Sequence, residues 1–290
     1  MSRLLMWLIF CASASILAQE PVPTPSQEGD VMLAAVSRDQ YMFSGGIGPS
    51  KWTGRGTVAV EPLARLTPSG EWKSLPCAAK NAKNCVKFAR EYLSKPHTYT
   101  VVSGDGQGAM IHAAPATLSE CNGYTGTGTY TDGNIAKSAI AASSTDFFAD
   151  SASPQLLGNA EAKPILKALD AFIPERLGSP LYLRFYTMRL GDQDLIVVQR
   201  TFADYVGKPE EGSLTLVFAI GTMEHGRLHV LRWKRDVTDE EEQLVGTIRL
   251  KSGRDFLITT VSDPESQTFR VYGILDGHLK LVYSGGGSSC

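Results

Sequence analysis

A four-strand pattern that occurs twice in the last third of the chain, between residues 181 and 283, is the strongest constraint on its fold. Each copy runs through four short apolar strands in the same order, and the second copy follows the first directly. The strands are residues 187–190, 194–198, 214–218 and 226–231 in the first copy, and 247–250, 255–259, 269–272 and 277–282 in the second. A four-strand unit that is repeated about every fifty to sixty residues predicts consecutive antiparallel meanders.

The rest of the chain adds short strands and two amphipathic helical segments, at residues 84–93 and 160–176. In the second segment Pro164 falls near the first turn, where a missing amide donor costs least. We therefore predict a mainly β fold with two covering helices, in which antiparallel meander sheets form propeller-blade-like repeats in the C-terminal half. Because a propeller takes about four to eight blades, two modules cannot close one by themselves. Either the N-terminal strands supply degenerate blades, or the modules pack as a small sandwich or an open barrel, which we expect.

The repeats resemble FG-GAP or VCBS-like blades, the integrin-type β-propeller family, over residues 181–284. In that family the loop between the first two strands has the pattern D-x-D-x-D-G and holds calcium, since several carboxylates must converge on a hard cation. The corresponding stretches here are Gly191–Asp194, with two carboxylates, and Ser252–Asp255, with one carboxylate beside Arg254. We expect these acids to cap turns, and we predict no metal and no cofactor.

Residues 1–18 have the form of a signal peptide, with Arg3 before a short apolar run and small residues leading to Ala18. Cleavage after Ala14 is an alternative. We expect a secreted or periplasmic protein with no membrane span. Its predicted parts are a Pro/Gly-rich linker and irregular segment at 19–50, a β-rich domain with one helix at 51–145, and the second helix plus the two modules at 159–290.

Within residues 51–145 the pattern predicts a hairpin over Gly56–Leu75, turning at Pro68-Ser69-Gly70. Further strands are expected at Tyr99–Val102, Ala109–Ala113, Tyr124–Tyr130 and Ile135–Ala142. A small, polar stretch at residues 143–158 is interpreted as the boundary before the second helix.

Four cysteines remain once the leader with Cys11 is removed, and an even number in an exported chain favours two disulfides. Cys85 shares a helix face with Phe88 and Tyr92, so it is expected to point toward the core. We predict a disulfide between Cys85 and Cys121, which leaves Cys77 with Cys290. A local Cys77–Cys85 disulfide is the alternative.

Composition and motifs give no concentrated catalytic signature. A net charge of −2 argues against nucleic acid, which requires a basic field. The glycine-rich stretch 123–130 fits a strand better than a phosphate loop. His225 and His229 are expected to be solvated strand residues, and His112 with Asp105 is the one pair that could belong to a dispersed active site.

Two further groups of residues have a binding and a packing interpretation. The acidic run Asp239–Glu242 is expected to be a solvated loop between the modules, and its alternative is a patch for a cationic partner. Trp52, Trp72 and Trp233 are expected to pack on sheets, and could otherwise stack on sugars.

From the sequence we predict a non-catalytic, exported β-rich protein that binds or scaffolds an unknown protein or glycan partner, with no catalytic residues. The alternatives are a secreted hydrolase with a dispersed active site and a calcium-dependent adhesion module.

The cysteine assignment is tested by peptide mapping of the unreduced protein. A fragment in which Cys85 is linked to Cys121 is expected, because both are assigned to elements that meet in the core. A Cys77–Cys85 fragment would replace this assignment with the local disulfide.

Overall fold

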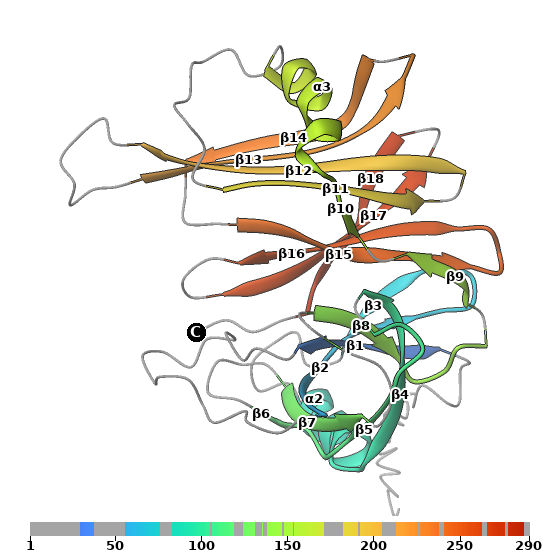
Figure 1. Cartoon of the computed structure of the whole chain (residues 1–290). Coiled ribbons are helices and arrows are strands. Elements are labelled where there is room, and N and C mark those ends of the chain that lie inside the picture. The colour runs from blue at the N-terminus through green and yellow to red at the C-terminus, as the bar shows by residue number, and fades with distance from the viewer. Residues whose placement is uncertain are drawn as a thin grey trace, which may run out of the picture.

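Three β-layers, stacked one on another, make up most of the structure (Figure 1). The computed structural model describes residues 30–37, 56–75, 83–104, 106–118, 124–130, 135, 138–146, 148–152, 154–170, 182–190, 192–204, 213–225, 227–237, 241–262, 266–275 and 278–286. The described residues form a mainly β fold with antiparallel sheets and two helical segments, as the sequence predicts.

The N-terminal strands close into a six-stranded antiparallel barrel in the order β2-β1-β8-β4-β5-β7, with β7 pairing back to β2. Its strands are β1 (Val31–Ser37), β2 (Thr57–Leu66), β4 (His97–Gly104), β5 (Met110–Ala113), β7 (Tyr124–Tyr130) and β8 (Ser138–Ala142). Two short strands extend it, β3 (Trp72–Ser74) beside β2 and β6 (Thr117–Leu118) beside β7. Closure satisfies strand edges that an open sheet would leave unpaired.

Alternate residues of the barrel strands fill its interior, since side chains of a strand point to opposite faces in turn. Met32, Val58, Val60 and Ile111 belong to this interior cluster. The helical segment α2 (Lys83–Phe88), continued by a π-helical turn (Ala89–Leu93), packs Phe88 and Leu93 into the same cluster. It ends before Pro96, as the restriction on the residue before a proline requires.

The two predicted modules form two five-stranded antiparallel sheets. The first-repeat sheet contains β11 (Tyr182–Leu190), β12 (Gln193–Asp204), β13 (Ser213–Glu224) and β14 (Arg227–Val237), and β10 (Gln155–Leu156) joins it beside β11. The second-repeat sheet contains β15 (Glu241–Leu250), β16 (Asp255–Ser262), β17 (Gln267–Leu275) and β18 (His278–Gly285), and β9 (Phe148–Ala152) joins it beside β15. The predicted strand order is confirmed in both copies.

The second-repeat sheet is the middle layer, and it is buried on both faces (Figure 1). Phe256 and Ile258 of β16 pack against the outside of the barrel, whereas Leu257 between them packs against the first-repeat sheet. The helix α3 (Asn159–Asp170) covers the other face of the first-repeat sheet with Ile165 and Leu169. The described modules therefore stack as a sandwich, which explains why β16 is apolar almost throughout.

Two predicted segments are wrong in detail. Residues 31–37, assigned to an irregular segment, form the buried barrel strand β1. The boundary stretch 143–158 contains β9 and β10, because each sheet recruits a strand from it. The described part of the second helix covers residues 159–170, which agrees with its predicted start within one residue, and Pro164 lies just after the first turn.

Substitution of Gly128 tests the closure of the barrel. A Cβ atom at Gly128 would lie 2.6 Å from Ile111 Cγ2 and 2.8 Å from Val60 Cγ2. Gly128→Ala is therefore expected to lower the free energy of unfolding by about 1–3 kcal/mol, measured by urea denaturation. The control is Thr127→Ala, because Thr127 is the exposed neighbour in the same strand. Equal stability of the two variants would contradict the barrel packing.

Candidate functional site

A buried carboxylate, Glu242, lies where the chain crosses from the first-repeat sheet to the second. It is the second residue of β15 and has no solvent exposure. Two hydroxyl groups donate to its Oε1: Thr259 Oγ1 at 2.8 Å and Tyr272 OH at 2.7 Å. These donors replace the water that the carboxylate loses on burial, which would otherwise cost several kcal/mol.

Three cationic side chains surround the other oxygen of Glu242. Arg270 Nη1 of β17 lies 3.4 Å from Oε2, and Lys234 Nζ and Arg232 Nη2 of β14 lie at 3.6 and 3.8 Å. The Arg232 guanidinium also lies 4.2 Å from the centroid of the Tyr272 ring. Because β14 belongs to one sheet and β17 to the other, this cluster ties the two repeat sheets together.

The cluster formed by Glu242, Arg232, Lys234, Arg270 and Tyr272 has more positive than negative charge. Its three cations keep 15–26% of their side-chain surface exposed, whereas the carboxylate keeps none. Burial, and then the neighbouring Glu242 carboxylate, raise the pKa of Tyr272, so its hydroxyl stays a donor. The buried carboxylate is thus satisfied by side chains of the same chain, and three cations stand around one acid.

The solvated loop predicted for residues 239–242 is therefore wrong at Glu242, and its partners are cations of the same chain. Asp239 and Glu240 lie outside the described residues, and of Glu241 only the strand position is described. The sequence could have indicated this burial, because Glu242 and the apolar Leu244 are two residues apart and therefore share one face of the strand. Leu244 packs between the repeat sheets.

The two repeat sheets meet along β14 and β18. These two strands are in contact, and each is an edge strand of its sheet. Large apolar side chains are exposed there: Trp233 on β14 is 44% exposed, and Leu281 and Val282 on β18 are 50% and 37% exposed. We call the surface formed by β14 and β18 the paired edge.

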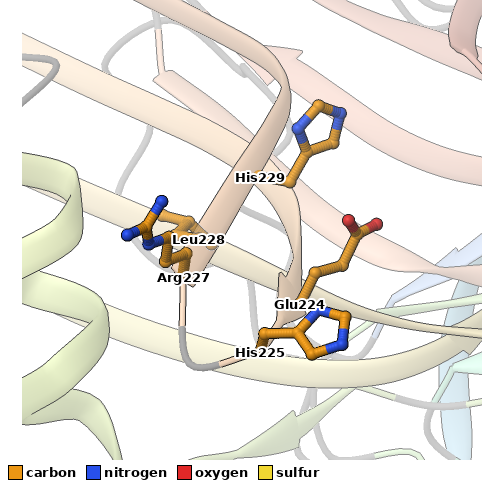
Figure 2. A pocket seen from close by; sticks show the side chains of 5 residues that line it. All are labelled: Glu224, His225, Arg227, Leu228 and His229. Carbon is orange, nitrogen blue, oxygen red and sulfur yellow. The ribbon is translucent and has the colours of Figure 1, made fainter.

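A hairpin pocket lies at the turn between β13 and β14, with a volume of about 550 Å³ (Figure 2). The described residues that line it are Glu224, His225, Arg227, Leu228 and His229. In Figure 2 the Glu224 carboxylate lies between the two imidazole rings. His225 is in the turn with φ 51, not on a strand as predicted, whereas His229 is on β14. Within the described ranges, no group of three His, Cys, Asp or Glu could hold a metal ion.

The other motifs found in the sequence have mixed outcomes. In the two turns that correspond to calcium loops, Asp194 faces Arg189 at 3.6 Å and Asp255 faces Arg249 at 3.5 Å. Burial raises the pKa of Asp255, and Arg249 opposes that effect. The strand predicted at 124–130 is confirmed, so the glycine-rich stretch from Tyr124 is not a phosphate loop.

Of the predictions for the tryptophans and the candidate catalytic pair, one is confirmed and others fall on residues outside the described part of the chain. Trp72 is confirmed as a packing residue, with its ring centroid 5.5 Å from that of Phe256 and 5.7 Å from that of Tyr283. Trp52 lies outside the described residues, and so does Asp105. His112 Nδ1 lies 3.4 Å from Thr98 Oγ1 on the neighbouring strand. The proposed pairing of His112 with Asp105 thus stays a prediction.

Residues 1–18, predicted to be a signal peptide, lie outside the described residues, as do most of the predicted linker and Cys77, Cys121 and Cys290. Cys85 lies in α2, but its side chain is not described, so both disulfide assignments stay predictions. No helix in the described part of the chain has the length and apolar character needed to cross a bilayer.

Comparison of the chain with protein-family models, with curated proteins and with solved structures gives no match. The resemblance to FG-GAP or VCBS-like repeats accordingly stays a prediction.

Removing the charge of Glu242 tests the role of the cluster. Glu242→Gln keeps the size of the side chain and its carbonyl acceptor, but removes the negative charge that faces Arg232, Lys234 and Arg270. The free energy of unfolding is expected to fall by about 3–5 kcal/mol in urea denaturation. The control is Asp194→Asn, which removes an exposed ion pair and should have a far smaller effect. A similar fall in the free energy of unfolding in both variants would show that the buried Glu242 cluster stabilises the fold no more than an exposed ion pair does.

Proposed function

We propose that the protein is an exported, non-catalytic binding protein, and that an acidic, extended segment of a partner protein binds along the paired edge. The observation that carries this proposal is the coincidence, on two adjacent edge strands, of basic charge with exposed apolar side chains. The leader-like residues 1–18 support export to the periplasm or the medium.

The charge of the paired edge is opposite to that of the whole chain. β14 and β18 together contain five basic residues (Arg227, Arg232, Lys234, Arg235 and Lys280) and one acid, Asp236. The chain as a whole has a net charge of −2. Since complementary charge steers association and disfavours wrong partners, an acidic segment is the favoured occupant.

The apolar residues and the strand geometry favour a polypeptide over a glycan. An edge strand presents backbone N–H and C=O groups in a row, and an extended peptide can add to it as a further strand. Side chains of such a peptide would alternate between the two faces, so that apolar residues can reach Leu281 and acidic residues can reach the basic groups. Trp233 adds a partly exposed aromatic surface on β14.

The Glu242 cluster supports this function by holding part of the edge in place. Arg232 and Lys234 lie on β14, and their ion pairs with the buried carboxylate restrict both long side chains. Binding then costs less side-chain entropy than it would with unrestrained cations.

Binding of a labelled peptide to the leaderless chain tests the proposal. The probe is a fluorescent ten-residue peptide that alternates Glu and Val, measured by anisotropy at low salt, and a Lys–Val peptide is the control ligand. The acidic peptide is expected to bind, and Lys280→Glu combined with Leu281→Ser is expected to weaken its binding at least about tenfold, since both a charge and an apolar contact are lost.

The matched control combines Lys163→Glu on α3 with Leu156→Ser on β10, which changes an exposed lysine and an exposed leucine on other elements. It should bind as the unaltered protein does. Equal binding of the acidic and basic peptides, or an equal loss in both double variants, would overturn the proposal. Binding to a heparin oligosaccharide without binding to the peptide would replace the peptide with an acidic glycan.

A further inference from the structure

A second buried carboxylate, Glu61, lies on the outer face of the barrel. The preceding residue of β2, Val60, packs into the barrel interior, so Glu61 points outward, toward the layer that covers this side. It is only 1% exposed. Neither of its carboxylate oxygens has a hydrogen-bond partner among the described residues.

The strand register places Glu61 at the end of a row that runs across the barrel surface beneath the second-repeat sheet. Glu61 pairs with Ala35 of β1, Ala35 with Ile140 of β8, and Ile140 with Ser103 of β4. Ala35 and Ile140 belong to the apolar cluster that joins the barrel to the second-repeat sheet. We call this contact the barrel seam.

The other end of the row shows how tightly the seam is packed. Ser103 is fully buried, and its hydroxyl also has no described partner. A Cβ atom at Gly246 of β15 would lie 2.2 Å from Ser103 Oγ, so only a glycine allows β15 to approach the barrel this closely. Water that could solvate a charge at Glu61 is excluded from an interface of this kind, and an unpaired charge there is costly.

We infer that Glu61 makes the barrel seam sensitive to protonation: the seam is stable while Glu61 is neutral, and it loosens when Glu61 loses its proton. The two layers joined by the seam are the barrel and the second-repeat sheet, so the inference concerns a surface other than the paired edge and is independent of its function.

Burial raises the pKa of Glu61 from 4.5 to about 7. The folded protein therefore binds a proton at Glu61 that the unfolded chain releases at lower pH. The contribution of Glu61 to the free energy of unfolding is fully present below pH 4.5, and it is lost as the pH rises to about 7. In this interval the equilibrium constant for unfolding increases up to roughly tenfold for each pH unit.

The charged groups of the surrounding elements do not account for this behaviour. Burial is the cause of the raised pKa of Glu61, without a contribution from a neighbouring charge. At the far end of the β1–β2 ladder, Asp30 is paired with Arg65 at 3.9 Å and with Lys73 at 3.8 Å. From the second-repeat sheet, the seam is met by the Tyr283 hydroxyl, which donates to Leu63 O at 3.2 Å. Arg254 reaches the turn at Gly70, and Asp255 faces Arg249.

Trp72 is a built-in reporter for the seam, because it lies on β3 of the barrel layer and contacts Phe256 and Tyr283 of the second-repeat sheet. In the leaderless chain with Trp52→Phe and Trp233→Phe, Trp72 is the remaining tryptophan. Acrylamide quenching of its fluorescence, from pH 4.5 to 8.5, is the local measurement. Urea denaturation over the same range is the global one.

In the otherwise unaltered protein, quenching is expected to rise between pH 6 and 8, and the unfolding constant to increase by on the order of a hundredfold across the range. Glu61→Gln should remove most of both changes, since it cannot ionise. Glu61→Leu is the second variant, of similar size, in case the amide is not tolerated. Ser103→Ala is the matched control, because it alters the same row without altering a titrating group, and it should keep the full pH dependence.

Two results would overturn the inference. One is a pH profile of Glu61→Gln or Glu61→Leu that matches the unaltered protein. The other is a rise in the unfolding constant with no accompanying change in Trp72 quenching, which would place the titrating group away from the seam.

Discussion

One buried carboxylate, Glu242, connects the two halves of the repeat region. It accepts hydrogen bonds from hydroxyl groups of β16 and β17 and faces cations from β14 and β17, so five side chains from two sheets contact this single acidic residue. A sheet-to-sheet contact made of apolar side chains alone tolerates sliding, because dispersion and hydrophobic burial are not directional. Hydrogen bonds and ion pairs to one carboxylate are directional, and they set how β14 lies over the second-repeat sheet.

The second-repeat sheet, the middle layer, packs against a different neighbour on each of its two faces. Its strands bury Phe256 and Ile258 against the barrel and Leu257 against the first-repeat sheet. On one face the buried carboxylate of Glu242 has hydroxyl and cationic partners, whereas across the seam on the other face the carboxylate of Glu61 has no hydrogen-bond partner among the described residues. The same physical cost of burying a carboxylate therefore produces a fixed contact in one place and a contact that depends on protonation in the other.

Local sequence patterns were sufficient for the elements that depend on local spacing. The order of strands in both modules, the turn at Pro68–Gly70 and the helix that carries Phe88 follow from alternation, turn residues and helical periodicity. Barrel closure was not accessible in this way, because the pairing of β2 with β7 joins residues that are far apart in sequence. The burial of Glu242 was not accessible for a related reason: four acids in a row are usually solvated, and the hydroxyl groups and cations that stabilise this buried carboxylate come from β14, β16 and β17.

By itself, the sequence determined a mainly β chain with a duplicated meander, two covering helices and a leader-like start. These properties are written in residue order, as periods of two and of about 3.6 residues and as the repetition of one unit. The tertiary structure alone decided that the modules stack face to face on a closed barrel and that Glu242 is satisfied where the chain crosses between them. It also decided that Glu61 has no hydrogen-bond partner among the described residues at the seam. The reason is that the burial of a polar group and its hydrogen bonds depend on which distant strands pack together, and the residue pattern of one strand does not determine its neighbours.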